Sequence, residues 1–220
     1  MTDWRFIWEK YVKGQHGPRE ATTRKQILRL HGKHAVDIGA SVGEYTFPLA
    51  KRFRWVHAFE PNPGKLSRIL VQASRKREWA KIILYPFALS NTIGETDLFL
   101  DPDGREGFSD TIMPVFNYNP GLAVREPHTF LGHKAISIKT RTYDGYFKDI
   151  SVDLVKIDVE GAEFRVLEGA REALQNRMVK RVVVELHDKT MQSPLLRLME
   201  GYGFKNRVLD DHPRIYCDLN

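Results

Sequence analysis

The sequence predicts a mixed α/β protein built on a doubly wound, mostly parallel sheet with an antiparallel hairpin at one edge. Three observations predict this fold. Apolar segments of strand length alternate along the chain with amphipathic segments of helical period. A turn of small residues, GASVG at 39–43, follows the first of these strands and opens a helix. The last two apolar segments, 204–209 and 214–218, meet across the polar pair Asp210-Asp211, as strands of a hairpin do.

The composition is that of one globular unit. The chain has 220 residues, 42% hydrophobic and 28% charged, so we expect a single domain over 1–220. No apolar run is long enough to cross a membrane, and residues 1–11 carry charges that do not fit a signal peptide. The net charge of +6 would suit RNA, but the basic residues are spread along the chain. A lone cysteine, Cys217, excludes an internal disulfide, so we expect the cytoplasm as compartment.

The first part of the chain predicts helices and strands that present the turn at 39–43. Residues 1–32 predict two helices, at 3–13 and 19–30. A strand at 35–38 leads into the turn, and a helix follows from near Tyr45. A second strand, 55–59, ends at Glu60 and precedes a helix that Pro61 and Pro63 start. The apolar face of that helix comprises Leu66, Ile69, Leu70 and Ala73.

The pattern changes after a third strand, 82–87, which ends at Ala88. Residues 91–145 predict an excursion between strands three and four, with strands at 96–100 and 136–140. The stretch 101–134 between them is long and irregular, as expected of a lid or substrate wall. Regularity returns with a strand at 152–158, a helix from Glu160, a strand at 181–186 and a helix capped by Ser193.

The turn at 39–43 is compatible with three classes of protein. A dinucleotide site needs G-x-G-x-x-G, but Ser41 and Glu44 occupy the second and third glycine positions. A serine hydrolase elbow, G-x-S-x-G, fits with Ser41 as nucleophile and Asp158 and His187 as later triad members, yet that elbow normally follows several strands. A nucleotide-like cofactor fits best, because Glu60 lies where such folds place a carboxylate against ribose hydroxyls.

Four stretches carry a family resemblance: VDIGASVGEYT at 36–46, FEPNP at 59–63, PFALS at 86–90 and VKIDVEGAE at 155–163. Over most of residues 34–190 the sequence resembles class I S-adenosylmethionine-dependent methyltransferases, and specifically the FkbM family. The resemblance implies a Rossmann-like methyltransferase sheet and S-adenosylmethionine as cofactor. Ser41 stands where the family often has Asn, which changes one polar contact.

The resemblance and the chemistry of the cofactor together suggest a binding set. Backbone N–H groups of the turn can hold its carboxylate, and Glu60 can accept both ribose hydroxyls. Asp37 can face its ammonium directly or through water. The family places adenine contacts at the end of strand three, here Phe87 and Ala88. The residues expected to contact the cofactor are Asp37, Gly39, Ala40, Ser41, Gly43, Tyr45, Glu60, Pro61, Asn62, Phe87, Ala88 and Asp158.

Methyl transfer to oxygen also needs a base that takes the hydroxyl proton. We expect Asp158, Glu185 and His187 to be catalytic, because they follow apolar strands on the cofactor side. Glu160 and Glu163 have a structural explanation as acids in a first helical turn. Asp158, Glu185 and His187 could jointly hold a divalent ion, but no spacing signature requires one, and we expect no metal.

The expected function is an S-adenosylmethionine-dependent O-methyltransferase. Its acceptor, by resemblance, is a hydroxyl of a sugar, glycoconjugate or polyketide-like molecule. Three alternatives stay open. An RNA methyltransferase could use the basic helix face from Lys65 to Arg77, a hydrolase could use Ser41, and a catalytically silent fold could serve binding alone.

Overall fold

The structure is a computed structural model that describes residues 18–100, 110–113, 115–116, 128–129, 134–209 and 214–219. The expected helix at 3–13, most of the stretch 101–134 and the pair Asp210-Asp211 lie outside the described residues. Among the helices that are described, none combines the length and the apolar character that crossing a membrane requires.

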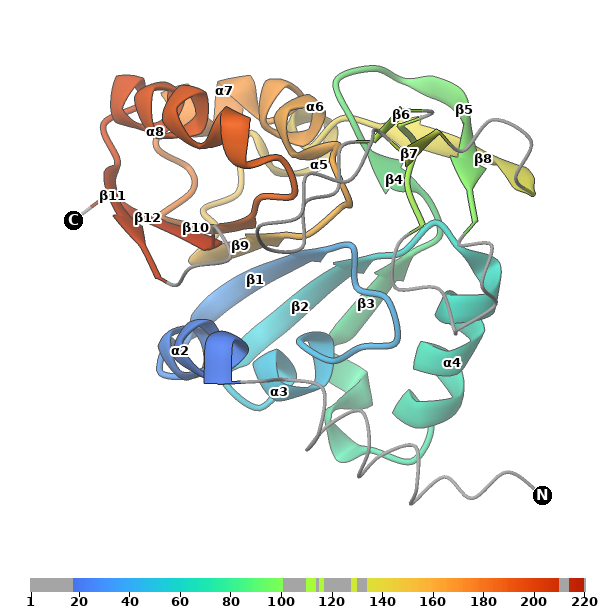
Figure 1. Cartoon of the computed structure of the whole chain (residues 1–220). Coiled ribbons are helices and arrows are strands. Elements are labelled where there is room, and N and C mark those ends of the chain that lie inside the picture. The colour runs from blue at the N-terminus through green and yellow to red at the C-terminus, as the bar shows by residue number, and fades with distance from the viewer. Residues whose placement is uncertain are drawn as a thin grey trace.

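A seven-stranded sheet forms the centre of the molecule, in the order β11-β12-β10-β9-β1-β2-β3 (Figure 1). Neighbouring strands are parallel from β10 through to β3, whereas β12 runs antiparallel to both β10 and β11. The predicted doubly wound sheet with an antiparallel edge is therefore confirmed. Its strands are β1 (Gly32–Ile38), β2 (Phe53–Phe59), β3 (Ile82–Tyr85), β9 (Leu154–Ile157), β10 (Arg181–Glu185), β11 (Lys205–Val208) and β12 (Arg214–Asp218).

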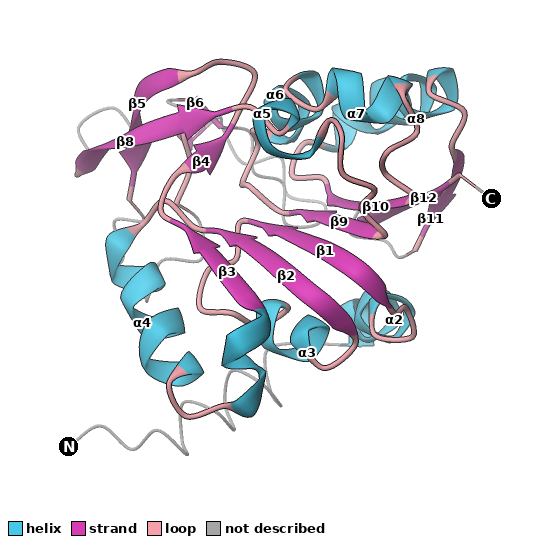
Figure 2. Cartoon of the chain, turned by 180° about the vertical axis from the view of Figure 1, so that it is seen from behind, coloured by secondary structure: helices cyan, strands magenta, loops and turns pink. Residues whose placement is uncertain are grey.

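Helices cover both faces of this sheet (Figures 1 and 2). One face packs on α2 (Pro18–Ile27), α3 (Thr46–Ala50) and α4 (Pro63–Ala73). The other face packs on four helices and meets a second buried cluster. These are α5 (Asp144–Phe147), α6 (Glu163–Glu168), α7 (Arg171–Gln175) and α8 (Gln192–Gly201), and two short 3-10 helices, η2 (Arg77–Lys81) and η3 (Lys189–Met191), complete the set.

Alternation along the strands divides the side chains between the two faces. Val155 and Ile157 of β9 belong to the cluster under α5–α8, and Leu154 belongs to the cluster under α2–α4. Lys156 therefore points to the α2–α4 side, and the same alternation sends Asp37 of β1 and Glu185 of β10 to that side. Charged residues near the carboxyl ends of three adjacent strands thus share one face of the sheet.

Two helices begin at residues other than those that the sequence predicts, α6 later and α8 earlier. The helix expected from Glu160 starts at Glu163, because Glu160 and Gly161 have φ of 52° and 100°, which no right-handed helix accommodates. The cap expected at Ser193 is also wrong, since α8 continues directly from η3. Asp188 caps that segment by accepting a hydrogen bond from the backbone N–H of Thr190 at 2.9 Å.

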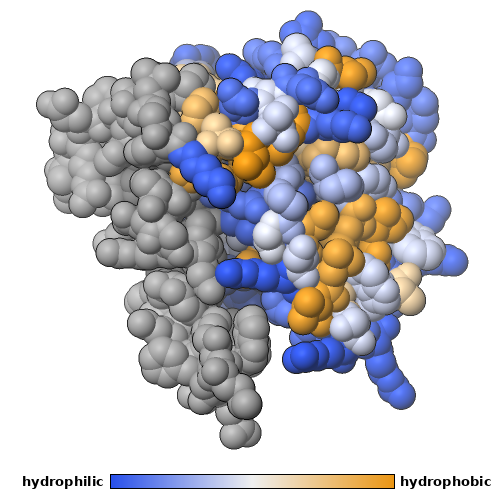
Figure 3. All heavy atoms as spheres, turned by 90° about the vertical axis from the view of Figure 1, so that its right-hand side faces the viewer, coloured by the Kyte–Doolittle hydropathy of each residue, from blue (hydrophilic) through white to orange (hydrophobic). Residues whose placement is uncertain are grey.

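The predicted apolar face of α4 is only partly buried. Ile69 and Ala73 are fully buried, whereas Leu70 is 44% exposed. Lys65, expected on a basic outer face, is instead buried and pairs with Asp110 at 3.1 Å. Figure 3, which views the side of the molecule where α4 lies, shows apolar atoms gathered among polar ones on this surface.

The excursion forms sheets of its own. Strands β4 (Ala88–Leu89), β8 (Ala135–Arg141) and β5 (Gly94–Phe99) pair in that order, and β6 (Val115–Phe116) pairs with β7 (His128–Thr129). The third strand of the main sheet therefore ends at Tyr85 and not at Ala88. Pro86 explains the break, because it has no N–H to continue the ladder. Ala162, from the loop after β9, packs into the small core of the excursion.

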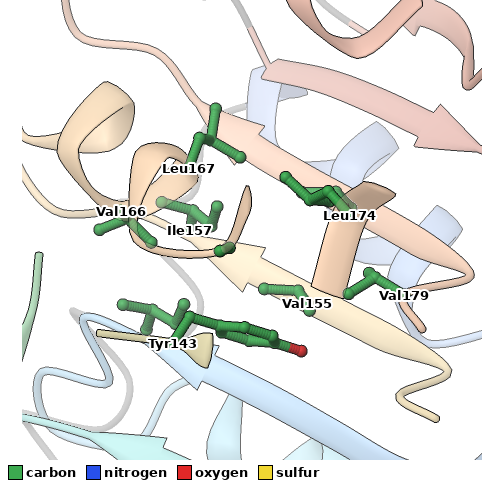
Figure 4. Close-up of a pocket in the computed structure, with 10 residues that line it drawn as sticks. Tyr143, Val155, Ile157, Val166, Leu167, Leu174 and Val179 are labelled. Atoms are coloured by element: carbon green, nitrogen blue, oxygen red, sulfur yellow. The ribbon is translucent and has the colours of Figure 1, made fainter. Parts of the chain in front are cut away.

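Tyr143 carries a buried hydroxyl that has no hydrogen-bond partner among the residues that the structure describes. The ring is 1% exposed and borders an apolar cavity under α6 and α7, with Val155 and Val179 among its other lining residues (Figure 4). A water there would find too few polar partners to replace the missing bond.

We expect Tyr143→Phe to raise the free energy of unfolding by about 1 kcal/mol, because it removes an unsatisfied polar group without changing the ring. Urea denaturation measures the change. Tyr146→Phe, at a half-buried position in the same helical segment, is the control and should change stability by less than about 0.5 kcal/mol. A less stable Tyr143→Phe protein would show that the hydroxyl is satisfied.

Candidate active site

The turn at 39–43 brings two strand ends into close contact. Gly39 has φ of 77°, and a Cβ at this position would lie 1.8 Å from the backbone oxygen of Asp158. Only glycine fits here. The backbone N–H groups of Gly39 and Ala40 both donate to the backbone oxygen of Phe59, at 3.1 and 3.0 Å. The carboxyl ends of β1, β2 and β9 are therefore held together at this point.

Glu60 is tied to the same turn. One carboxylate oxygen accepts from the N–H of Ser41 and the other from the N–H of Asn62, each at 2.8 Å. The residue is 3% exposed, and burial raises the pKa of Glu60 to about 7 despite the nearby Lys65 and these two bonds. Since each carboxylate oxygen has two lone-pair sites, one site on each remains for a hydroxyl.

The backbone N–H groups of the turn donate to groups within the chain, whereas we expected them to hold the carboxylate of the cofactor. Gly39 and Ala40 donate to Phe59, Ser41 donates to Glu60, and Gly43 donates to the backbone oxygen of Ala40 at 2.8 Å. These four N–H groups are satisfied within the chain. The expected binding of a carboxylate by the turn as a whole is therefore not supported by this geometry.

Asp37 is completely buried and does not open toward the crevice. Its carboxylate accepts a 2.6 Å hydrogen bond from the hydroxyl of Thr46, and its other oxygen lies 3.5 Å from the ammonium of Lys156. Burial raises the pKa of Asp37, while Lys156 and Thr46 act in the opposite direction. A direct contact between Asp37 and the ammonium of a ligand does not fit this position, and the contact through water that the sequence also suggested stays a prediction.

Lys156 is the functional residue that sequence reasoning missed. Its ammonium lies 3.1 Å from Asp158, 3.2 Å from the backbone oxygen of Gly39 and 5.1 Å from the centre of the Tyr45 ring. Burial would lower the pKa of Lys156, but Asp158 and Asp37 outweigh it and raise that pKa above its ordinary value. The available signal was a lysine inside the apolar strand VKID. An internal cation therefore balances both carboxylates.

His187 lies among three carboxylates that follow β9, two from the loop and one from the start of α6. Nδ1 is 2.8 Å from Glu163, and Nε2 is 3.3 Å from Glu160 and 3.7 Å from Asp158. Burial would lower the pKa of His187, but Glu160 and Glu163 raise it well above its ordinary value. Burial also raises the pKa of Glu160, which His187 opposes. Glu160 and Glu163 thus belong to the cluster and are more than helix-terminal charges.

The three predicted catalytic residues do come together. Asp158, Glu185 and His187 each place one nitrogen or oxygen within 4.8 Å of the others. Glu185 is further held by Arg214, whose Nε and guanidinium NH2 donate to its two oxygens at 2.9 and 2.7 Å. Asp158 is the most open of the carboxylates in this cluster, with 26% of its side chain exposed.

The predicted adenine contacts occupy different surroundings. Phe87 is half-buried and stacks on Tyr146, with ring centres 5.5 Å apart. Ala88 lies in the excursion core, not at the end of the third strand. Asn62, beside Pro61, caps α4 through its side-chain oxygen and donates from its side-chain nitrogen to Asp110 at 2.6 Å. Strand-end placement was therefore wrong for Phe87 and Ala88.

A serine hydrolase is not supported by the geometry of Ser41. Its hydroxyl is buried and has no hydrogen-bond partner, so the serine–histidine bond of a triad is missing among the described residues.

Tyr45, which the sequence predicts to contact the cofactor, is mostly buried against Lys156, and burial raises the pKa of Tyr45 to about 12.

The glycine turn, the carboxylate after the second strand and the seven-stranded sheet with one antiparallel strand define a class I S-adenosylmethionine-dependent methyltransferase. A family model described as the methyltransferase FkbM domain matches residues 37–205. The chain belongs to the FkbM methyltransferase family, whose cofactor is S-adenosylmethionine.

Two characterised relatives are similar in sequence. The hexuronic acid methyltransferase AglP of Haloferax volcanii is 28% identical over 154 residues, which cover 69% of this chain and 54% of AglP. The 31-O-demethyl-FK506 methyltransferase FkbM of Streptomyces tacrolimicus is 27% identical over 211 residues, covering 84% of this chain and 80% of FkbM. The chain thus spans about half the length of AglP.

Solved structures show the same fold at low identity. Methyltransferase FkbM from Methylobacillus flagellatus KT superposes with a TM-score of 0.54 at 18% identity, covering 84% of this chain and 43% of that one. An rRNA methylase from Streptococcus thermophilus superposes with a TM-score of 0.51 at 12% identity, covering 92% and 98%. These likenesses show the fold alone.

Proposed function

We propose that this chain transfers a methyl group from S-adenosylmethionine to a hydroxyl of a sugar, glycoconjugate or polyketide-like molecule. The observation that carries the proposal is the cluster of Asp158, Glu185 and His187 at the strand ends beside the glycine turn. The acceptor class is supported by the two relatives, one named for a hexuronic acid and one for a hydroxyl of FK506.

The residues present fit the cofactor. Glu60 has lone pairs left for two ribose hydroxyls, and the buried hydroxyl of Ser41 has no partner of its own within the described chain. Asp158 can meet a positively charged group, because its carboxylate is partly exposed and is held in place by Lys156. S-adenosylmethionine supplies an activated methyl group on a sulfonium. The protein's part is to orient that group and to exclude water.

In this proposal Asp158 removes the proton from the acceptor hydroxyl. A hydroxyl must lose its proton during methyl transfer, and Asp158 is the carboxylate of the cluster that solvent and acceptor reach most easily. His187 orients the carboxylates of the site, because its two ring nitrogens lie 2.8 Å from Glu163 and 3.3 Å from Glu160. A single domain over 1–220 and a cytoplasmic location remain part of the proposal.

The test is a methyl-transfer assay with radiolabelled S-adenosylmethionine and a panel of acceptors. The panel contains hexuronic acids, glycans, hydroxylated macrolides and ribosomal RNA. We expect label in a carbohydrate or macrolide and none in RNA. Label in RNA alone would reverse the choice of acceptor, and failure to bind S-adenosylmethionine would contradict the proposal itself.

The affinity for S-adenosylmethionine should depend on pH through Glu60. Below pH 7 the carboxyl is protonated in the free protein, so a ligand that needs the ionised form must displace a proton. Affinity should therefore rise between pH 6 and about 8, with most of the change near pH 7. Calorimetry of wild type and Glu60→Gln measures the difference, and the variant should lack this component. Parallel pH curves for the two proteins would exclude Glu60 as a contact.

A further inference from the structure

The loop after β9 and the end of β10 assemble nitrogen and oxygen atoms around a single point. His187 supplies Nε2, which lies 3.7 Å from an oxygen of Asp158 and 3.3 Å from an oxygen of Glu160. Glu185 adds a carboxylate oxygen within 4.8 Å of both Asp158 and His187. These atoms lie at or just after the ends of β9 and β10, two strands that are adjacent in the sheet, so the main fold brings them together.

The separations match those of ligand atoms that share one metal ion. Bonds of about 2.0–2.2 Å place two ligand atoms roughly 3–4 Å apart, depending on the angle at the metal. The distances from Nε2 to Asp158 and Glu160 fall in that range. Glu185 lies within a wider limit of 4.8 Å, and its oxygens also accept from Arg214, so it would bind the ion while sharing its carboxylate with that guanidinium.

Glu160 provides a second observation that points to a cation here. Its Oε2 is buried and accepts no hydrogen bond from the described residues, although it lies 3.3 Å from Nε2 of His187. Buried carboxylate oxygens are normally satisfied, and the cost of leaving one unsatisfied is large. This oxygen lies beside Nε2 of His187, where a cation bound to both atoms would satisfy it.

The charges of the surroundings favour a cation as well. Carboxylates at Asp37, Asp158, Glu160, Glu163 and Glu185 face the permanent cations Lys156 and Arg214, so negative groups outnumber positive ones. Most of these side chains are buried, where screening by water is weak. A divalent cation would offset this excess of negative charge.

Glu163 prepares His187 for the role of ligand. Its carboxylate, 3% exposed, lies 2.8 Å from Nδ1 and can accept the proton there. The other ring nitrogen, Nε2, then faces Asp158 and Glu160 with its lone pair. Histidine ligands of metals are held by carboxylates in this way, which fixes both the tautomer and the orientation of the ring.

We propose that His187, Asp158, Glu160 and Glu185 bind one divalent transition-metal ion of the Mn²⁺ type, with Glu163 orienting the histidine. One imidazole with several carboxylates suits such an ion better than Mg²⁺ or Ca²⁺, which prefer oxygen ligands alone. If the proposed function holds, an ion at this point would also polarise the acceptor hydroxyl next to Asp158. The metal site itself does not depend on that function.

The test is direct binding of Mn²⁺ to the purified, chelator-treated protein, followed by calorimetry and electron paramagnetic resonance. We expect one site per chain and, in pulsed spectra, coupling of the manganese to an imidazole nitrogen. His187→Gln and Asp158→Asn should each weaken binding at least about tenfold. Glu168→Gln, in the same helix as Glu163, should bind as wild type, because its amide oxygen can still accept from Asn91.

The outcomes are distinct. Absence of stoichiometric binding, or binding without nitrogen coupling in the wild type, would overturn the proposal even if the variants fail to fold. Binding that survives in both His187→Gln and Asp158→Asn would place the ion elsewhere. Calorimetry with S-adenosylmethionine on the metal-free protein is run in parallel, so that failure of the cofactor assignment is recognised separately.

Discussion

Asp158→Asn is expected to lower the turnover number at least about a hundredfold, the lower end of what a lost general base costs. The amide preserves the size of the side chain and removes the charge that faces both Lys156 and His187. Asp158 directly follows β9, the strand next to β1, so its backbone lies against Gly39 of the glycine turn, and 26% of its side chain is exposed. Affinity for S-adenosylmethionine should stay within a few-fold of wild type, because Glu60 is untouched.

Steady-state kinetics with the acceptor identified by the panel, together with calorimetry, separate these two effects. Glu185→Gln should act in the same direction but less strongly, since Arg214 already occupies both oxygens of Glu185. Glu168→Gln is the control and should turn over normally. Normal turnover by Asp158→Asn would assign this carboxylate a structural role, as the partner of Lys156.

Lys156→Met should lower the free energy of unfolding by about 3–5 kcal/mol, which is the cost of breaking a buried ion pair from one side. The ammonium is the cation that Asp37 and Asp158 share, and Asp37 is completely buried. Without it, Asp37 must remain as an uncompensated charge or take up a proton. Urea denaturation measures the loss, which should lower Tm as well.

Two further variants test whether the lost ion pair causes the loss of stability in Lys156→Met. Lys180→Met removes a half-exposed lysine that pairs with Asp153 at 2.6 Å, and should cost less than about 1 kcal/mol. Adding Asp37→Asn to Lys156→Met should recover part of the lost stability, because it removes the stranded charge. An additive double variant would show that Asp37 and Lys156 do not interact.

Much of the main sheet could be predicted from the sequence. Apolar runs such as VVVE in β10 and WVHAF in β2 have no other plausible state, and the parallel order follows from their alternation with helices. The cluster of Asp158, Glu185 and His187 was also predictable, because residues that end adjacent parallel strands meet at one edge.

The errors have local physical causes. Glu160 and Gly161 take positive φ, which moved a helix start by three residues, and Pro86 ended a strand that looked continuous. The partners of the charged groups were harder, because they come from distant parts of the chain. Arg214 reaches Glu185 across 29 positions, and Lys156 reaches Gly39 across 117. No local pattern in the sequence predicts such pairs.

The carboxylate of Glu60 has two roles, because it also accepts a hydrogen bond from the backbone of Ser41. The side chain that we propose as the ribose contact also fixes the backbone of the turn, where Ser41 has φ of 50°. The loss of affinity for S-adenosylmethionine in Glu60→Gln should therefore include the cost of ordering this turn as well as the lost ribose contact.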